Sequence, residues 1–231
     1  MPQSFFRSVF WTTVGKKIVI AISGLALFLF VIVHLLGNLT LLSGNPDTFN
    51  AYSHKLTSLG PILYFAEFLL AAAFLFHMSL AVWTTLKNWG TRSKNYVIVK
   101  SAGGESKKTL SSTTMIYTGA VIIIFTVLHL ITFKYGPGIA DGYFTYLNGE
   151  KVRDLHRLVI EVFQKEWFVI WYVAAMVFLG FHLRHAFWSG LQSLGANNQK
   201  LSSYLYGLGL AFALILAFGF IFIPLWVYFV Y

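Results

Sequence analysis

Five long apolar stretches dominate the pattern of hydrophobic and polar positions along the chain. Each is about 19 to 27 residues long, whereas about 20 residues are needed to cross the hydrocarbon core of a bilayer as a helix. Helices in soluble proteins rarely stay apolar on all faces over such a length. The pattern therefore predicts five transmembrane helices, at about Ile18–Leu42, Pro61–Leu86, Met115–Phe133, Trp167–Ser189 and Tyr204–Val230.

A shorter amphipathic pattern occupies the third loop, residues 134–166. Apolar residues recur there at i, i+3, i+4, i+7 and i+8, with charged residues between them, at Leu155, Leu158, Val159, Val162 and Phe163. This spacing predicts a short amphipathic helix at the outer membrane interface. The expected fold is an all-α integral membrane bundle that forms a single domain over residues 1–231.

Composition agrees with a membrane protein and narrows the chemistry. Hydrophobic residues make up 57% of the chain and charged residues only 11%, against about a quarter in soluble domains. The absence of cysteine excludes Cys-ligated iron–sulfur clusters and covalently attached c-type haem. The net charge of +9 suits residues that orient the helices in the membrane and contact anionic lipid. Nucleic-acid binding is excluded, because the chain has no separate basic domain outside the spans. Residues 1–17 lack a signal-peptide pattern.

Lysine and arginine are concentrated in alternate loops. With a cytoplasmic N-terminus, the inner segments hold 11 of the 17 positive residues and one acidic residue, Glu105. The outer segments hold the other six positive residues together with six acidic ones. The positive-inside rule therefore predicts that the N-terminus is cytoplasmic.

Four of the seven histidines lie inside predicted spans, one in each of the first four: His34, His77, His129 and His182. Each lies past the middle of its span, roughly 5–7 Å from the midplane toward the C-terminal end. Because consecutive spans alternate in direction, His34 and His129 are expected in an outer layer and His77 and His182 in an inner layer, about 10–14 Å apart. Each pair suits the two axial positions of a b-type haem.

Other interpretations of these histidines stay open. A histidine in a membrane helix can simply form a hydrogen bond to a neighbouring helix, so one haem or a haem-free bundle is an alternative. Four ionisable groups at matched depths favour two haems, because such groups are costly in a membrane and usually functional. His185 shares a helix face with His182 and competes with it as a ligand. Candidates to bind haem propionates, or simply to mark the interface, are Arg184, His185 and Lys17.

Glu67 is the only carboxylate inside a predicted span. It lies ten residues, about 15 Å, before His77 and therefore near the outer surface. A carboxylate there can exchange the proton that accompanies quinone chemistry, with Tyr64 and His54 nearby. The alternatives are an interfacial residue with its carboxylate in water, and a quinone pocket at the inner end, near Thr12, Thr13 and Lys17.

Several short segments follow one another in a distinctive order and spacing. They are Val14-Gly15-Lys16-Lys17, Val33–Leu39, Phe49–Tyr52, Phe76-His77, Leu128-His129, Phe181–Trp188 and Leu191–Gly195. In this order they resemble the cytochrome b membrane subunit of bacterial respiratory complex II, the five-helix type with two haems. The resemblance covers almost the whole chain, although no single segment is highly specific.

The resemblance implies two haem b groups, with axial pairs His34/His129 and His77/His182, and a quinone, expected to be menaquinone. It implies a subunit of a succinate dehydrogenase or fumarate reductase in the bacterial cytoplasmic membrane. An FAD-containing flavoprotein and an iron–sulfur protein would dock on the cytoplasmic side, and a higher oligomer is allowed. The chain itself would not act on the dicarboxylate. The alternatives are a dihaem cytochrome b of a hydrogenase or formate dehydrogenase, and a haem-free anchor or transporter.

Overall fold

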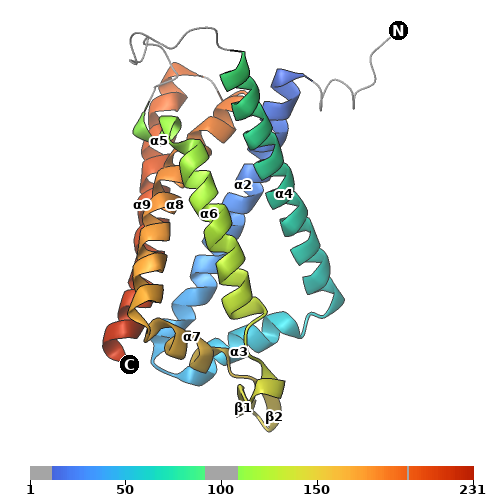
Figure 1. The fold of residues 1–231 in the computed structure, drawn as a ribbon, viewed down its shortest axis with the longest axis vertical. Coiled ribbons are helices and arrows are strands. Elements are labelled where there is room, and N and C mark those ends of the chain that lie inside the picture. The colour runs from blue at the N-terminus through green and yellow to red at the C-terminus, as the bar shows by residue number, and fades with distance from the viewer. Residues whose placement is uncertain (1–11, 92–108, 197) are drawn as a thin grey trace. The chain divides into compact units, whose positions relative to one another are not determined.

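The computed structural model describes residues 12–91, 109–196 and 198–231. Within these residues five helices are long and apolar enough to cross a membrane, which confirms the predicted fold class (Figure 1). They are α2 (Thr13–Asn38), α4 (Pro61–Gly90), α6 (Met115–His129), α8 (Glu166–Ser193) and α9 (Gln199–Val230). Seven charged residues of the predicted inner segments lie outside the described residues: Arg7, Arg92, Lys94, Lys100, Glu105, Lys107 and Lys108.

The helices extend beyond the apolar runs that predicted them. Helix α2 begins five residues before Ile18, because the Thr12 hydroxyl accepts the Gly15 N–H at 3.0 Å and caps the first turn. Helix α6 continues into a π-helix, η2 (Leu130–Lys134), directly after His129. A short helix, α5 (Leu110–Thr113), precedes α6.

The loops contain elements that were not predicted. A 3-10 helix, η1 (Leu39–Ser43), leads to α3 (Pro46–Thr57), where the Asn45 side chain accepts the Asp47 N–H at 2.9 Å. After the 3-10 turn η3 (Ile139–Asp141), β1 (Phe144–Leu147) pairs with β2 (Glu150–Arg153) as an antiparallel hairpin. Its turn residues Asn148 and Gly149 both have positive φ, as a tight two-residue hairpin requires.

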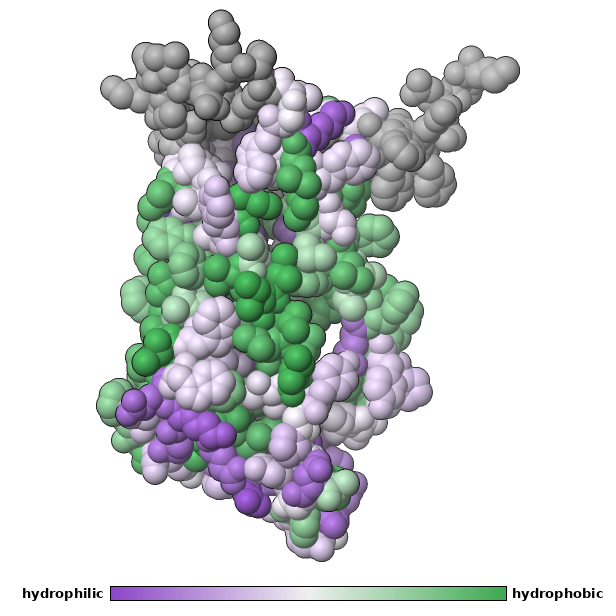
Figure 2. Space-filling model, viewed as in Figure 1, coloured by the Kyte–Doolittle hydropathy of each residue, from purple (hydrophilic) through white to green (hydrophobic). Residues whose placement is uncertain are grey.

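The predicted amphipathic helix is present as α7 (Leu155–Phe163). Leu158, Val159, Val162 and Phe163 are buried, and α7 packs beside α3 (Figure 1). The helix therefore buries its apolar face against protein. The long helices instead expose large apolar side chains, such as Ile62 and Phe68, and their surface is largely hydrophobic (Figure 2). Such a surface suits contact with lipid.

The chain forms two compact units. Unit 1 comprises residues 1–29, 69–119 and 181–213, and unit 2 comprises residues 30–68, 120–180 and 214–231. In unit 1, Phe28 packs against Phe187 and Phe212, with ring centres 5.3 and 5.7 Å away. In unit 2, Tyr172 is surrounded by aromatic rings: Phe125, Phe133, Phe163 and Phe168. The expected single domain stays a prediction.

Candidate functional site

Unit 1 brings two of the predicted histidines together. The rings of His77 on α4 and His182 on α8 have centres 6.5 Å apart and planes inclined by 70°. The Nδ1 atom of His77 lies 3.0 Å from the carbonyl oxygen of Ile20. A carbonyl only accepts hydrogen bonds, so this Nδ1 carries the hydrogen and a neutral ring leaves Nε2 with its lone pair free.

His182 is held in the same tautomer by a different partner. Its Nδ1 lies 3.1 Å from the hydroxyl of Thr118, and that hydroxyl donates its own hydrogen to the carbonyl of Met115. With its hydrogen on that carbonyl, the hydroxyl oxygen accepts from Nδ1 of His182. Both rings of unit 1 thus present an unprotonated Nε2, which is the arrangement that a metal-binding histidine requires.

Glycine makes room for the His77 ring. A Cβ atom at Gly24 would lie 2.9 Å from Cε1 of His77, which is closer than real carbon contacts. At Gly119 the added atom would lie 3.6 Å from Cε1 of His182, an ordinary contact. Gly24 is therefore needed where α2 faces the His77 ring, and any side chain there displaces the ring.

Unit 2 brings the other two histidines together. The rings of His34 on α2 and His129 on α6 have centres 5.7 Å apart and perpendicular planes. Nδ1 of His129 lies 3.1 Å from the Tyr172 hydroxyl, which can donate or accept and so does not fix the tautomer. Nε2 of His34 lies 3.4 Å from the side-chain amide nitrogen of Asn38 and receives a long hydrogen bond from it.

The two pairs fit the axial positions of a haem. An imidazole nitrogen binds a first-row metal at about 2 Å and lies about 1 Å from its ring centre, so two axial imidazoles have centres about 6 Å apart. The observed separations, 5.7 and 6.5 Å, lie on either side of that value. Across the described residues, no three His, Cys, Asp or Glu side chains converge to bind a metal on their own. Pairs of imidazoles are what a porphyrin leaves for the protein to supply.

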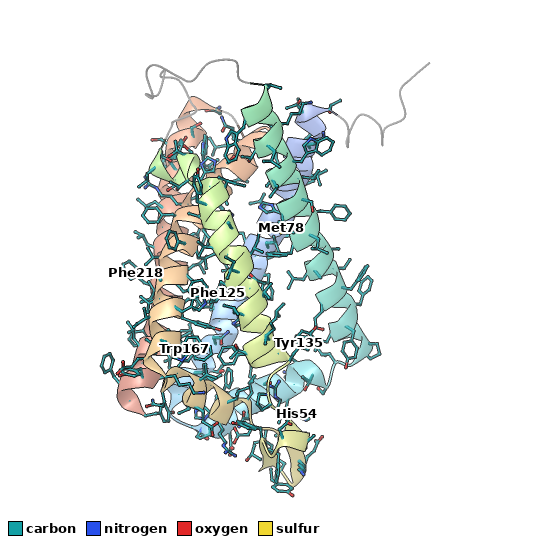
Figure 3. All side chains as sticks on the ribbon, in the orientation of Figure 1. His54, Met78, Phe125, Tyr135, Trp167 and Phe218 are labelled. Carbon is teal, nitrogen blue, oxygen red and sulfur yellow. The ribbon has the colours of Figure 1, made fainter. Side chains whose placement is uncertain are left out.

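Glu67 has a partner that the sequence did not indicate. Its carboxylate accepts a hydrogen bond from Nζ of Lys134, at the end of the π-helix, and both side chains are about one third exposed. Tyr64, one turn before Glu67, is largely exposed. His54 instead pairs with Glu150 of β2 at 3.4 Å, in an open cleft of about 540 Å³ beside the hairpin (Figure 3). Glu67 and His54 thus interact with different groups.

Comparison with known proteins adds independent information. Residues 12–100 match the model of a family described as the succinate dehydrogenase/fumarate reductase transmembrane subunit. This match supports membership of that family. It covers less than half of the chain and contains one histidine of each pair, His34 and His77. Searches of curated proteins and of solved structures found no match. Family and helices together support a multi-pass membrane subunit.

The two adjacent lysines near the start of α2, Lys16 and Lys17, differ in how far their side chains are buried. Lys17 is exposed, as are Arg184 of α8 and both Thr12 and Thr13, while His185 is half-buried. Lys16 is only 7% exposed, and its Nζ lies 3.5 Å from the ring centre of Trp83. The sequence pointed to Lys17 and not to Lys16, because two adjacent lysines at the start of an apolar helix give no indication of which side chain is buried. The role of Lys17 stays a prediction.

Arg153 is a second residue that sequence reasoning missed. From β2 its guanidinium donates to the carbonyls of Phe133, Lys134, Gly136 and Pro137. These carbonyls belong to the end of the π-helix and the turn after it, where backbone groups have no partner within the helix. Arg153 therefore fixes the segment Phe133–Pro137, which follows His129 and includes Lys134.

Proposed function

We propose that this chain is the membrane anchor and electron-transfer subunit of a succinate:quinone oxidoreductase. It passes electrons between the iron–sulfur subunit and a quinone, menaquinone by expectation, through two haem b groups. The observation that carries the proposal is the presence of two imidazole pairs, with ring centres 5.7 and 6.5 Å apart, in a five-span chain whose residues 12–100 match the family. The match argues against a hydrogenase or formate dehydrogenase subunit.

Each histidine pair holds one haem. His77 and His182 bind one, with Ile20 and Thr118 keeping the Nε2 atoms available, and His34 and His129 bind the other. A bound haem supplies one-electron redox chemistry. Apolar side chains next to the rings exclude water. In unit 2 these include Phe30 and Phe220, whose rings lie 5.2 and 5.9 Å from His34.

Glu67 exchanges the proton that accompanies quinone oxidation or reduction. The carboxylate lies ten residues before His77 on α4, near the outer end of the span, where water can supply a proton, and it is paired with Lys134. Tyr64 is on the same face of α4, one turn away. His54 is a weaker candidate, because its ring is engaged by Glu150.

The remaining assignments follow from the charge pattern and the resemblance. The N-terminus and the segment 87–114 between the predicted second and third spans face the cytoplasm of a bacterium, where the flavoprotein and the iron–sulfur protein dock. The excess of positive residues in these segments supports this orientation. The complex as a whole oxidises succinate or reduces fumarate, and this chain contributes no group to that reaction.

The test is purification of the chain from its own membranes, followed by measurement of haem, flavin and spectra. We expect two haem b per chain by pyridine haemochrome, a flavin-containing subunit in the same peak, and b-type bands that appear on addition of succinate. A chain without haem would be a plain anchor and would overturn the proposal. Two haems without a flavoprotein would instead identify a subunit of another respiratory enzyme.

A further inference from the structure

Unit 1 contains cations but, in its described part, no carboxylate. The acidic side chains that the structure describes all fall in unit 2: Asp47, Glu67, Asp141, Glu150, Asp154, Glu161 and Glu166. Glu105 lies outside the described residues. Lysine and arginine side chains of unit 1 therefore have no described acidic side chain of their own unit to pair with.

Lys16 is the cation for which this matters most. It is 7% exposed, and its ammonium group lies over the Trp83 ring, a neutral partner that compensates only part of a buried charge. It also lies in the first turn of α2, the end of a helix where the backbone dipole disfavours a cation and favours an anion. A buried charge in such a position is costly unless an anion is paired with it.

The position of Lys16 along α2 indicates where that anion comes from. It precedes Ile20 by four residues, about 6 Å along the helix, and the Ile20 carbonyl binds Nδ1 of His77. It precedes Gly24, which abuts the His77 ring, by eight residues, so all three lie on one face of the helix. On α4, Thr84 follows His77 by seven residues, again on one face. The Thr84 hydroxyl is buried and has no hydrogen-bond partner among the described residues.

We propose that Lys16, assisted by the Thr84 hydroxyl, binds a propionate carboxylate of the haem held by His77 and His182. This inference rests on the proposed function, since it requires a haem at that pair. An ammonium and a hydroxyl are both donors, and a carboxylate is the acceptor that satisfies them with a charge-assisted bond. Lys17 carries the same charge on the next residue but is exposed, so it does not share this role.

The experiment is a redox titration of the intact complex with Lys16→Met, compared with Lys17→Met and Lys87→Met. All three variants remove one positive charge from unit 1, and Lys87 is an exposed residue of α4 with no role in either site. Removing a cation beside a propionate favours the oxidised, more positive iron. For Lys16→Met we expect the ratio of oxidised to reduced haem at a given potential to rise about tenfold. This corresponds to about 59 mV toward lower potential. Lys16→Arg should keep the wild-type value.

The haem in question is identified as the one that His77→Ala removes, so the shift must appear in that haem alone. If Lys16→Met fails to assemble, Lys16→Gln is titrated in its place. The inference is overturned if Lys16→Met and Lys17→Met shift the potential equally, or if no neutral variant at Lys16 shifts it. In either case, two haems per chain would leave the proposed function intact. A wild-type chain without haem would overturn both.

An anionic lipid headgroup offers the same chemistry as a propionate and is distinguished by a second measurement. The wild-type complex and Lys16→Met are titrated in vesicles of phosphatidylcholine alone and in vesicles that also contain phosphatidylglycerol. The difference between them should persist in phosphatidylcholine if the anion is the propionate. In infrared difference spectra, a carboxylate band labelled through isotopic 5-aminolevulinate should move in Lys16→Met. A potential difference that requires phosphatidylglycerol assigns Lys16 to lipid and overturns the inference.

Discussion

Unit 1 and unit 2 each bring two histidines together, but the protein holds the rings differently. In unit 1 the Ile20 carbonyl can only accept, and the Thr118 hydroxyl accepts when its own hydrogen is on the Met115 carbonyl, so both Nδ1 atoms donate and both Nε2 atoms stay available. In unit 2 the Tyr172 hydroxyl can act either way, and the amide of Asn38 occupies Nε2 of His34. The difference indicates that unit 1 is prepared for two axial bonds before a ligand arrives, whereas unit 2 must first release a hydrogen bond.

The two units also differ in charge. Unit 2 pairs its charges internally, as in Glu67–Lys134, His54–Glu150 and Arg157–Glu161. Unit 1 has buried Lys16 and no described carboxylate. Groups that can exchange protons are therefore concentrated in unit 2, which suits a quinone site, while unit 1 depends on an anion brought by a bound molecule.

The largest expected effect separates the two units by removing one ligand at a time. His77→Ala or His182→Ala should remove one haem, and His34→Ala or His129→Ala the other. Each variant should retain about one haem per chain by pyridine haemochrome, because a single axial ligand no longer holds the haem of the mutated site and the other site is untouched. The reduced bands that survive should be identical within each pair of variants and different between pairs.

His185→Ala provides the control for this experiment, because it removes an imidazole three residues from His182. We expect it to retain both haems. Loss of a haem in His185→Ala, together with retention in His182→Ala, would transfer the ligand role to His185 and break the comparison between the units.

A smaller change tests the space that Gly24 leaves for His77. Gly24→Ala should lower the occupancy of the unit 1 haem and leave the unit 2 haem unchanged, because the new methyl would lie 2.9 Å from Cε1 of His77. Gly207→Ala is the matched control, since it is a helical glycine of unit 1 with nothing within 4 Å of the added atom. Equal haem contents in the two variants, measured against chain concentration, would show that the ring has room to move aside.

The hydrogen bonds behind the ligands should have the next smaller effect. Thr118→Val removes the acceptor for the Nδ1 hydrogen of His182, and we expect about tenfold weaker haem retention, the lower end for such a partner. Tyr172→Phe should cost less, because the Tyr172 hydroxyl does not fix the tautomer of His129. The rate of haem transfer to added apomyoglobin measures both. If Tyr172→Phe lost haem faster than Thr118→Val, the histidines of unit 2 would be the better preorganised pair, and the comparison between the units would be reversed.

The sequence predicted the spans and the histidine pairs because both depend on one-dimensional quantities, namely hydrophobic length and depth. It could not predict which ring nitrogen points where, since Ile20 and Thr118 become partners only through packing. Lys134 and Glu67 are 67 residues apart, and nothing local couples them. The β hairpin is a different case, because the adjacent pair Asn148-Gly149 is a strong local turn signal in the sequence itself.

The smallest expected effect concerns the stability of unit 2 outside its spans. His156 of α7 is buried, its backbone N–H donates to Asn50, and its Nε2 lies 3.4 Å from the Tyr231 hydroxyl. Burial lowers the pKa of His156 below its ordinary value of 6.5, although the neighbouring Asp154 opposes this. The unfolded chain therefore binds a proton near pH 6.5 that the folded chain does not bind. The contribution to stability is complete above that pH and is lost as the pH falls toward the lower pKa of the folded state.

Protection of the α7 amides from hydrogen exchange, corrected for intrinsic rates, should accordingly decrease below about pH 6.5 in the wild-type complex. In His156→Gln the decrease should be weaker, because glutamine does not titrate and keeps the backbone hydrogen bond to Asn50. Amides of α2 in unit 1 serve as the internal reference, since His156 does not belong to that unit. The same pH dependence in both proteins would mean that another group of unit 2 causes the loss of protection. The neutral form of His156 would then not stabilise the packing of α7 against α3.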